Sequence, residues 1–350
     1  MLGYRVFISH SHDDEKDAVQ IEKHLRRIGF RPIRMADLKG FHVFPQHIRD
    51  GIAYAHAFMP LLTTRSETRP WVQQEIGYAM GLEVPVVPVA IGQMPAELAF
   101  VRDVKVLQLD PDLANLESDL TGDKIAWAVG GSPAPFAPYY FAESQLARSG
   151  MLADLARRII SFRGRDLSED DRIRHRAGLT SFSNPVDMPL EDVSWGHRYG
   201  IGDLAEPYCR ALQDECLTLR DYATIAGCDL IVDISGDAAG RGSPARLEGL
   251  AVLRRFLLQM PEGMVRIVNQ PRRRPDNLLL VGDWFVAESA TLDTHAGYSN
   301  TVFTRHAPTV LDRIARFDRQ FNALLTQTVQ SNRPSVQAAI ELIEAEMGQA

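Results

Sequence analysis

Short apolar runs in the first third of the chain alternate with segments whose apolar residues recur at helical spacing. The runs are rich in Val, Ile, Leu and Phe and lie at residues 4–9, 31–35, 58–63, 84–91 and 104–109. Strands that are apolar on both faces are typical of a parallel sheet covered by helices on each side, because neither strand face meets water. The pattern predicts a three-layer α/β fold for this region.

Two helices are predicted between these runs. The segment 13–28 places apolar residues at helical spacing among charges, and Gly29 follows as a candidate end. The segment 66–81 predicts a second helix, which Pro70 can begin and Gly81 can end. Glu75 would then lie near the start of the helix that follows the third strand.

The composition changes to Gly, Pro and Ala between residues 110 and 145, with GGSPAPFAP at 130–138. Such a segment continues neither a helix nor a central strand. We therefore predict a first domain at 1–130, a linker at 131–145 and a second domain at 146–350.

The second domain also mixes helices and strands. Residues 143–178 are predicted to be mostly helical, and their eight arginines and six acidic residues are interpreted as a solvated face. A further helix is predicted at 203–222. Strand-like and helix-like runs then alternate, which predicts a second α/β domain; they lie at 228–235, 244–260, 265–270, 277–289, 309–325 and 334–347.

Four ordered blocks of the first domain resemble the TIR family. They are YRVFISHSHDDE at 4–15, RPIRMADLKG at 31–40 with IRDGIAYA at 48–55, FMPLLTTRSETRPWVQQEIGYA at 58–79, and VPVVPVAIG at 84–92. The resemblance covers about 130 residues and implies a flavodoxin-like fold with a central parallel sheet. Two positions depart from the usual pattern: Val72, where many members have Cys, and His10, where Tyr is common.

In the enzymatic branch of this family, the Glu of a Trp-x-x-x-Glu helix cleaves NAD at the nicotinamide glycosidic bond, and Glu75 matches that position. The bond breaks toward an oxocarbenium-like state, which a nearby carboxylate stabilises. Nicotinamide leaves from a cationic pyridinium, so no second carboxylic acid has to protonate it. The resemblance implies NAD as substrate and no separate cofactor.

The other candidate substrate contacts follow the carboxyl ends of predicted strands, where ligands bind to doubly wound sheets. Trp71 is the exception, since it lies four residues before Glu75 on the same helical face. The candidates at strand ends are Ser9, His10, Ser11, Asp37, Lys39, Thr63 and Thr64.

Each of these residues also has a purely structural interpretation. Glu75 can be a solvated carboxylate, and Trp71 can pack in the core. Asp37 can hydrogen-bond its own turn instead of a ribose hydroxyl. His10 and His12 have the spacing of metal ligands on a strand, but no third ligand is near them in the sequence, so no metal site is predicted.

The segment VRIVNQPRRRPDNLLLVGDWFVAES at 265–289 resembles part of a phospholipase D-type half-domain. That family carries His-x-Lys and a downstream Asp, where this chain has Asp276, Leu278 and Asp283. Without the His nucleophile and the Lys phosphate ligand, the chemistry is lost. The resemblance therefore implies a degenerate domain that serves binding or assembly.

A basic cluster of Arg272, Arg273 and Arg274, with Arg266 nearby, can contact a phosphate-bearing ligand, a nucleic acid or an acidic partner, or can be a solvated loop. The net charge of −7 disfavours a nucleic-acid partner. The Gly-rich turn at 233–244 can cradle phosphate, although it matches neither a Walker nor a dinucleotide motif.

Compartment and topology are predicted from what the sequence lacks. The three cysteines, Cys209, Cys216 and Cys228, show no paired spacing and are interpreted as buried thiols in a reducing compartment. No signal segment or long apolar run is found, which favours a cytoplasmic protein without a membrane partner.

The resemblance implies a bacterial-type TIR effector in which NAD hydrolysis is activated by self-association of TIR domains. The second domain would sense an unknown trigger or partner, in defence against phage. Two alternatives stay open. The TIR domain can be a non-enzymatic interaction module, or it can release a cyclised ADP-ribose signal instead of the hydrolysed product.

Overall fold

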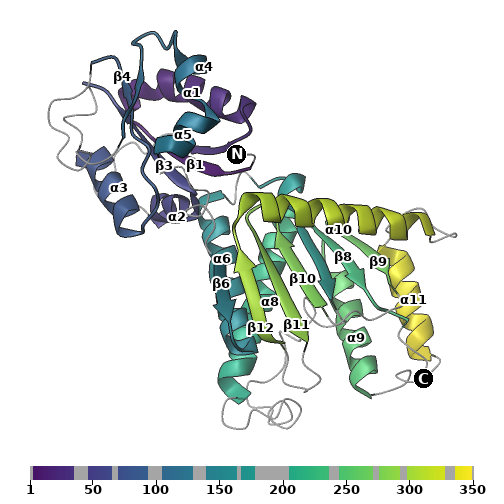
Figure 1. The fold of residues 1–350 in the computed structure, drawn as a ribbon. Helices are drawn as coiled ribbons and strands as arrows, with labels where there is room; N and C mark the ends of the chain where they lie inside the picture. Colours follow the sequence, from purple (N-terminus) through teal and green to yellow (C-terminus); the bar gives the residue numbers. More distant parts are fainter. Residues whose placement is uncertain are drawn as a thin grey trace. The chain divides into compact units, whose positions relative to one another are not determined.

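The computed structural model describes two compact units (Figure 1). The first comprises Met1–Pro138 with His306–Pro308, and the second comprises Tyr139–Arg305 with Thr309–Ala350. The residues that the structure describes are 3–34, 46–64, 70–93, 105–128, 139–163, 167–177, 205–235, 244–270, 276–291, 298–327 and 336–348.

The first unit is built on a sheet of five parallel strands in the order β2-β1-β3-β4-β5. This confirms the predicted α/β fold with a central parallel sheet. The run at 84–91 yields only a short strand because Pro85 and Pro88 cannot donate to a ladder. The strands are β1 (Arg5–Ser9), β2 (Arg31–Arg34), β3 (Ala57–Leu62), β4 (Val89–Ile91) and β5 (Leu107–Leu109).

Alternate residues of β1 pack into different layers of the first unit. Ile8 lies in a core cluster with Ile21 of the amphipathic helix α1. Phe7 instead approaches α2, where a Cβ added at Gly51 would come within 2.9 Å of the Phe7 ring, so only glycine allows this close packing. The helices of this unit are α1 (Glu15–Arg27), α2 (Gln46–Tyr54), α3 (Pro70–Gly81), α4 (Leu116–Asp119) and α5 (Gly122–Ala128).

The second unit contains a mixed sheet of seven strands in the order β6-β12-β11-β10-β7-β8-β9. The neighbours β7, β8 and β9 run parallel, whereas the pairings from β7 through β10, β11 and β12 to β6 are antiparallel. The strands are β6 (Tyr139–Ala142), β7 (Ile173–Ala177), β8 (Cys228–Val232), β9 (Val265–Asn269), β10 (Asp276–Val281), β11 (Phe285–Thr291) and β12 (Tyr298–Thr304).

Helices cover this sheet on its two faces. The long helix α10 packs Phe317 and Phe321 against Leu278 and Leu280 of β10. On the other face, α6 and α8 pack against each other, and Arg148 of α6 contacts β11 at Ser289. The helices are α6 (Gln145–Arg163), α8 (Ala205–Ala226), α9 (Pro244–Gln259), α10 (Ala307–Gln327) and α11 (Val336–Gly348).

The predicted helical character of residues 143–178 was wrong in its second half. Helix α6 ends at Arg163, and β7 follows as a central strand between β10 and β8. Its sequence, IRHRA, is polar and so gives no sign of a central strand. In the structure, Arg174 and Arg176 reach α10, where they donate to Asp318 and Gln320. Polar partners on a packed helix allow such a strand to be central.

The apolar run at 277–289 is two strands, not one. Strands β10 and β11 pair antiparallel through a tight turn at Gly282, which adopts a φ of 50° that favours glycine. Strands β6 and β12 were not predicted at all.

The interpretation of the arginine-rich segment as a solvated face was wrong for two of its members. Arg148 is only 1% exposed and lies 2.8 Å from Glu215, which is 2% exposed. Arg172 is likewise buried and lies 2.8 Å from buried Asp229. These side chains are interior ion pairs because acidic partners from α8 and β8 meet them inside the fold.

Candidate functional site

The carboxyl ends of β1 and β3 lie side by side in the first unit. The two strands are parallel neighbours, and Ser9, the last residue of β1, is in register with Pro60 of β3. Thr63 follows β3 directly and is buried. Because parallel strands end at the same edge of a sheet, the loops after them form one polar crevice.

Glu75 reaches this crevice from α3. Glu75 is the sixth residue of α3, a helix with both buried and exposed positions, and it is only 4% exposed. Val72, Ile76 and Ala79 are buried beside it on the helix. Glu75 is therefore an acid on the inward face of α3 and not the solvated carboxylate that its sequence context allows.

The environment of Glu75 changes its acidity. Burial raises the pKa of Glu75 from its usual 4.5 to about 7, since a charged carboxylate is poorly solvated there. The hydroxyl of Ser9 and the indole of Trp71 face the carboxyl group and partly offset this rise in pKa. Both partners are neutral. A carboxyl group that titrates near pH 7 can be ionised at physiological pH without being held by a cation.

His10 is oriented by its own loop. Its Nδ1 donates to the carbonyl oxygen of Ser11 at 2.8 Å, and its Nε2 lies 3.4 Å from a carboxylate oxygen of Glu15 on α1. The structure thus places His10 between the loop after β1 and the start of α1. These two contacts direct both ring nitrogens toward protein groups.

A buried carboxyl group, that of Asp14, stabilises the loop after β1. The sequence did not mark this residue as part of the site. One oxygen of Asp14 accepts hydrogen bonds from the hydroxyls of Ser11 and Thr63. The only signal in the sequence is the Ser-x-x-Asp spacing of residues 11–14, a local hydrogen-bonding pattern. Its partner Thr63 lies 49 residues away and could not be anticipated.

The structure brings together part of the predicted site. Ser9 and Trp71 face Glu75, Ser11 and Thr63 meet at Asp14, and Thr64 is exposed. Asp37 and Lys39, with the rest of the loop at 37–45, lie outside the described residues, as do Arg272, Arg273 and Arg274.

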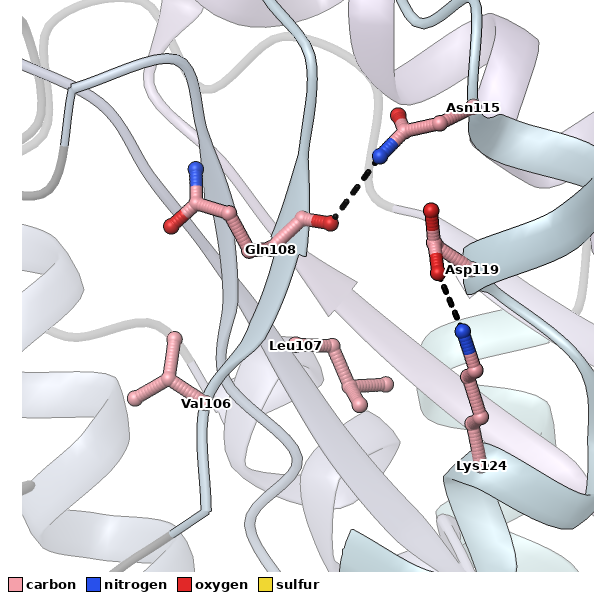
Figure 2. Close-up of a pocket in the computed structure, with 6 residues that line it drawn as sticks. All are labelled: Val106, Leu107, Gln108, Asn115, Asp119 and Lys124. Atoms are coloured by element: carbon pink, nitrogen blue, oxygen red, sulfur yellow. Dashed lines mark hydrogen bonds and ion pairs between the residues drawn. The ribbon is translucent and has the colours of Figure 1, made fainter.

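A separate cavity of about 530 Å³ lies beside β5. Figure 2 shows the side chain of Asn115 turned toward Gln108, where its amide donates to the Gln108 carbonyl oxygen at 3.3 Å, and Lys124 paired with Asp119. Apolar walls come from Val106 and Leu107. The Gln108 side chain donates to the Gly92 carbonyl oxygen at 2.6 Å, and the ion pair is partly exposed to solvent. This cavity therefore offers no reactive group comparable to Glu75.

Comparison with known proteins identifies the first unit. Residues 6–120 match the family model described as TIR domain. The first unit contains a TIR domain. A search of curated proteins found no match to the chain. The TIR match spans β1 to α4 and includes Glu75, Asp14 and Thr63.

The match does not extend to the second unit, and the resemblance to phospholipase D remains a prediction there. Leu278, at the position of that family's Lys, is 4% exposed and packs with α10. The three cysteines are free and buried. Among the described residues, no group of three candidate ligands could hold a metal ion. None of the described helices combines the length and apolar character needed to cross a membrane.

Proposed function

We propose that the TIR domain cleaves NAD at its nicotinamide glycosidic bond and that Glu75 is the catalytic residue. The observation that carries this proposal is the burial of Glu75 at the carboxyl edge of the sheet, where the neutral side chains of Ser9 and Trp71 face it and its pKa rises to about 7. Perturbed acids of this kind concentrate in functional sites, because catalysis requires acids and bases whose pKa values lie near the working pH.

The chemistry requires a single ionised carboxylate. As the bond between the ribose C1′ and the nicotinamide nitrogen breaks, positive charge develops on the sugar, and ionised Glu75 stabilises it. Nicotinamide departs with the bonding electron pair as a neutral molecule. Water then adds its oxygen to C1′ and releases a proton, which yields ADP-ribose. A poorly solvated carboxylate interacts more strongly with the developing charge than an exposed one does.

Two alternatives use the same domain differently. A non-enzymatic interaction module would recruit other TIR domains, but such a role gives no reason to keep an acid buried at a destabilising position. A signal synthase would cleave the same bond and let a group of the substrate, in place of water, attack C1′, which gives a cyclised product. Product analysis separates that reaction from hydrolysis.

The remaining parts of the proposal concern activation. TIR domains commonly self-associate, and we propose that association completes the pocket and that the second unit responds to a trigger in anti-phage defence. Gating of this kind would protect cellular NAD in the resting state. It agrees with a two-unit chain in which the TIR match covers one unit.

The deciding experiment compares NAD consumption by the wild-type protein and Glu75→Gln, with products resolved by chromatography and assembly followed by light scattering. We expect the substitution to lower kcat by about 1000-fold or more, since it removes the stabilising charge. The matched control is Glu117→Gln, whose side chain is 73% exposed, and it should retain activity.

The pH dependence provides a second criterion. Because the pKa of Glu75 is about 7, kcat/KM should rise with pH and level off above that value. Equal activity of wild type and Glu75→Gln would exclude the catalytic role. Absence of nicotinamide release from an assembled wild-type protein would favour the interaction module.

A further inference from the structure

We propose that Asp14 is a positioning residue of the TIR domain. It ties the loop after β1 to the residue that follows β3 and thereby holds the surroundings of Glu75 in the reactive arrangement. This inference rests on the proposed function and extends it from Glu75 to a second buried acid of the same unit.

Asp14 occupies a buried position at the amino end of α1. It is fully buried, precedes α1 directly, and its backbone N–H donates to the Ser11 carbonyl oxygen at 3.0 Å. One of its carboxyl oxygens accepts from the Ser11 hydroxyl and, at 3.0 Å, from the Thr63 hydroxyl. A negative charge at the amino end of a helix is also favoured by the helix dipole.

The contacts of Asp14 join the loop after β1 to the residue after β3. Ser11 lies two residues after Ser9, whose hydroxyl faces Glu75. Thr63 directly follows β3, and the next helix along the chain is α3, which carries Glu75. The two hydrogen bonds therefore connect the strand end that presents Ser9 with the chain segment that precedes the helix of Glu75.

The hydrogen bonds of Asp14 are shielded from solvent. Ser11, Asp14 and Thr63 are all less than 7% exposed, so water cannot readily replace a lost hydroxyl partner. Removing one of the two bonds should let the strand ends shift relative to each other. A displacement of about 1 Å in a catalytic site can lower the rate about 100-fold.

The two hydrogen bonds that Asp14 accepts from Ser11 and Thr63 form a clamp between the loops. The experiment uses the full-length chain and two independent ways of breaking this clamp, Asp14→Ala and Thr63→Val. We expect kcat to fall by about 10- to 100-fold, with KM changing much less. Thr63→Ser keeps the hydroxyl and should restore most of kcat. The double variant should be no slower than Asp14→Ala, because both changes remove the same hydrogen bond.

The control for charge is Asp17→Asn, which removes an acidic residue from the first turn of α1 without touching the clamp. It should leave kcat unchanged. Circular dichroism and thermal unfolding verify the fold of each variant. Thr63→Val is nearly isosteric and keeps the proposal testable if Asp14→Ala fails to fold.

A readout that does not depend on activity separates this inference from the proposed function. The titration of Glu75, followed by NMR of carboxyl-labelled glutamate and assigned with Glu75→Gln, should move to a higher pKa in Thr63→Val, because a displaced Ser9 no longer favours the charged form. An unchanged titration together with kcat within about twofold of wild type would overturn the positioning role. A wild-type protein without NAD cleavage would instead refute the proposed function, even if the titration moved.

Discussion

Buried acids of the two units differ in what surrounds them. In the TIR domain, Glu75 is 4% exposed and is faced by the neutral groups of Ser9 and Trp71. In the second unit, Glu215 is 2% exposed and binds Arg148 at 2.8 Å and the Ser149 hydroxyl at 2.5 Å. Burial alone therefore does not mark a reactive acid; the kind of partner does.

Asp229 strengthens the contrast. Arg172 donates to one of its oxygens at 2.8 Å, Arg266 donates to the same oxygen at 2.7 Å, and Arg266 also binds the second oxygen. An acid bound by two arginines is held in one position by charge-assisted hydrogen bonds. Such groups stabilise one packing of the unit, whereas Glu75 retains a proton equilibrium near neutral pH.

The largest expected stability effect comes from breaking the pair between Arg148 and Glu215. Arg148→Met leaves Glu215 buried without its cation and should lower the free energy of unfolding by about 3–5 kcal/mol. Chemical denaturation of the variant measures this loss. The double variant with Glu215→Leu should recover much of it, because no uncompensated charge remains. A loss below about 1 kcal/mol in the single variant would show that solvent reaches the site.

Glu75→Gln should change the free energy of unfolding in the opposite direction and stabilise the protein above neutral pH. The folded protein binds the Glu75 proton more tightly than the unfolded chain does, so ionisation of Glu75 costs stability. That cost is absent below about pH 4.5 and complete above about pH 7, where it amounts to about 3 kcal/mol. The variant should therefore be more stable than wild type at pH 8 and no more stable at pH 4. Equal stability at both values would mean that Glu75 titrates normally.

The smallest effect is expected at the surface. Arg157 lies 2.6 Å from Asp214, and the two side chains are 51% and 44% exposed. Arg157→Gln should change the free energy of unfolding by less than about 1 kcal/mol, because solvent screens the pair. This variant is the reference for Arg148→Met, since both remove an arginine from α6. A comparable loss in both would contradict the distinction between buried and exposed pairs.

Much of the TIR fold could be predicted because short stretches of the sequence indicate its strands and helices. Apolar runs mark the strands, and the TIR-like blocks place Glu75 on its helix. The second unit was less predictable. Strand β7 carries two arginines and a histidine among its five residues, so no apolar run indicates a central strand there. Its polar groups are acceptable only because α10 offers partners about 144 positions away, at Asp318 and Gln320.

The sequence by itself determined the parallel α/β fold of the first unit and the candidate acid Glu75, because periodicity and motif spacing act within a few turns of chain. Only the tertiary structure decided which buried charges have partners. Arg148 and Glu215 are 67 residues apart in sequence, and Asp14 and Thr63 are 49 apart. Such pairs depend on how strands and helices pack, and packing decides whether a carboxyl group meets a cation, a hydroxyl or an apolar wall.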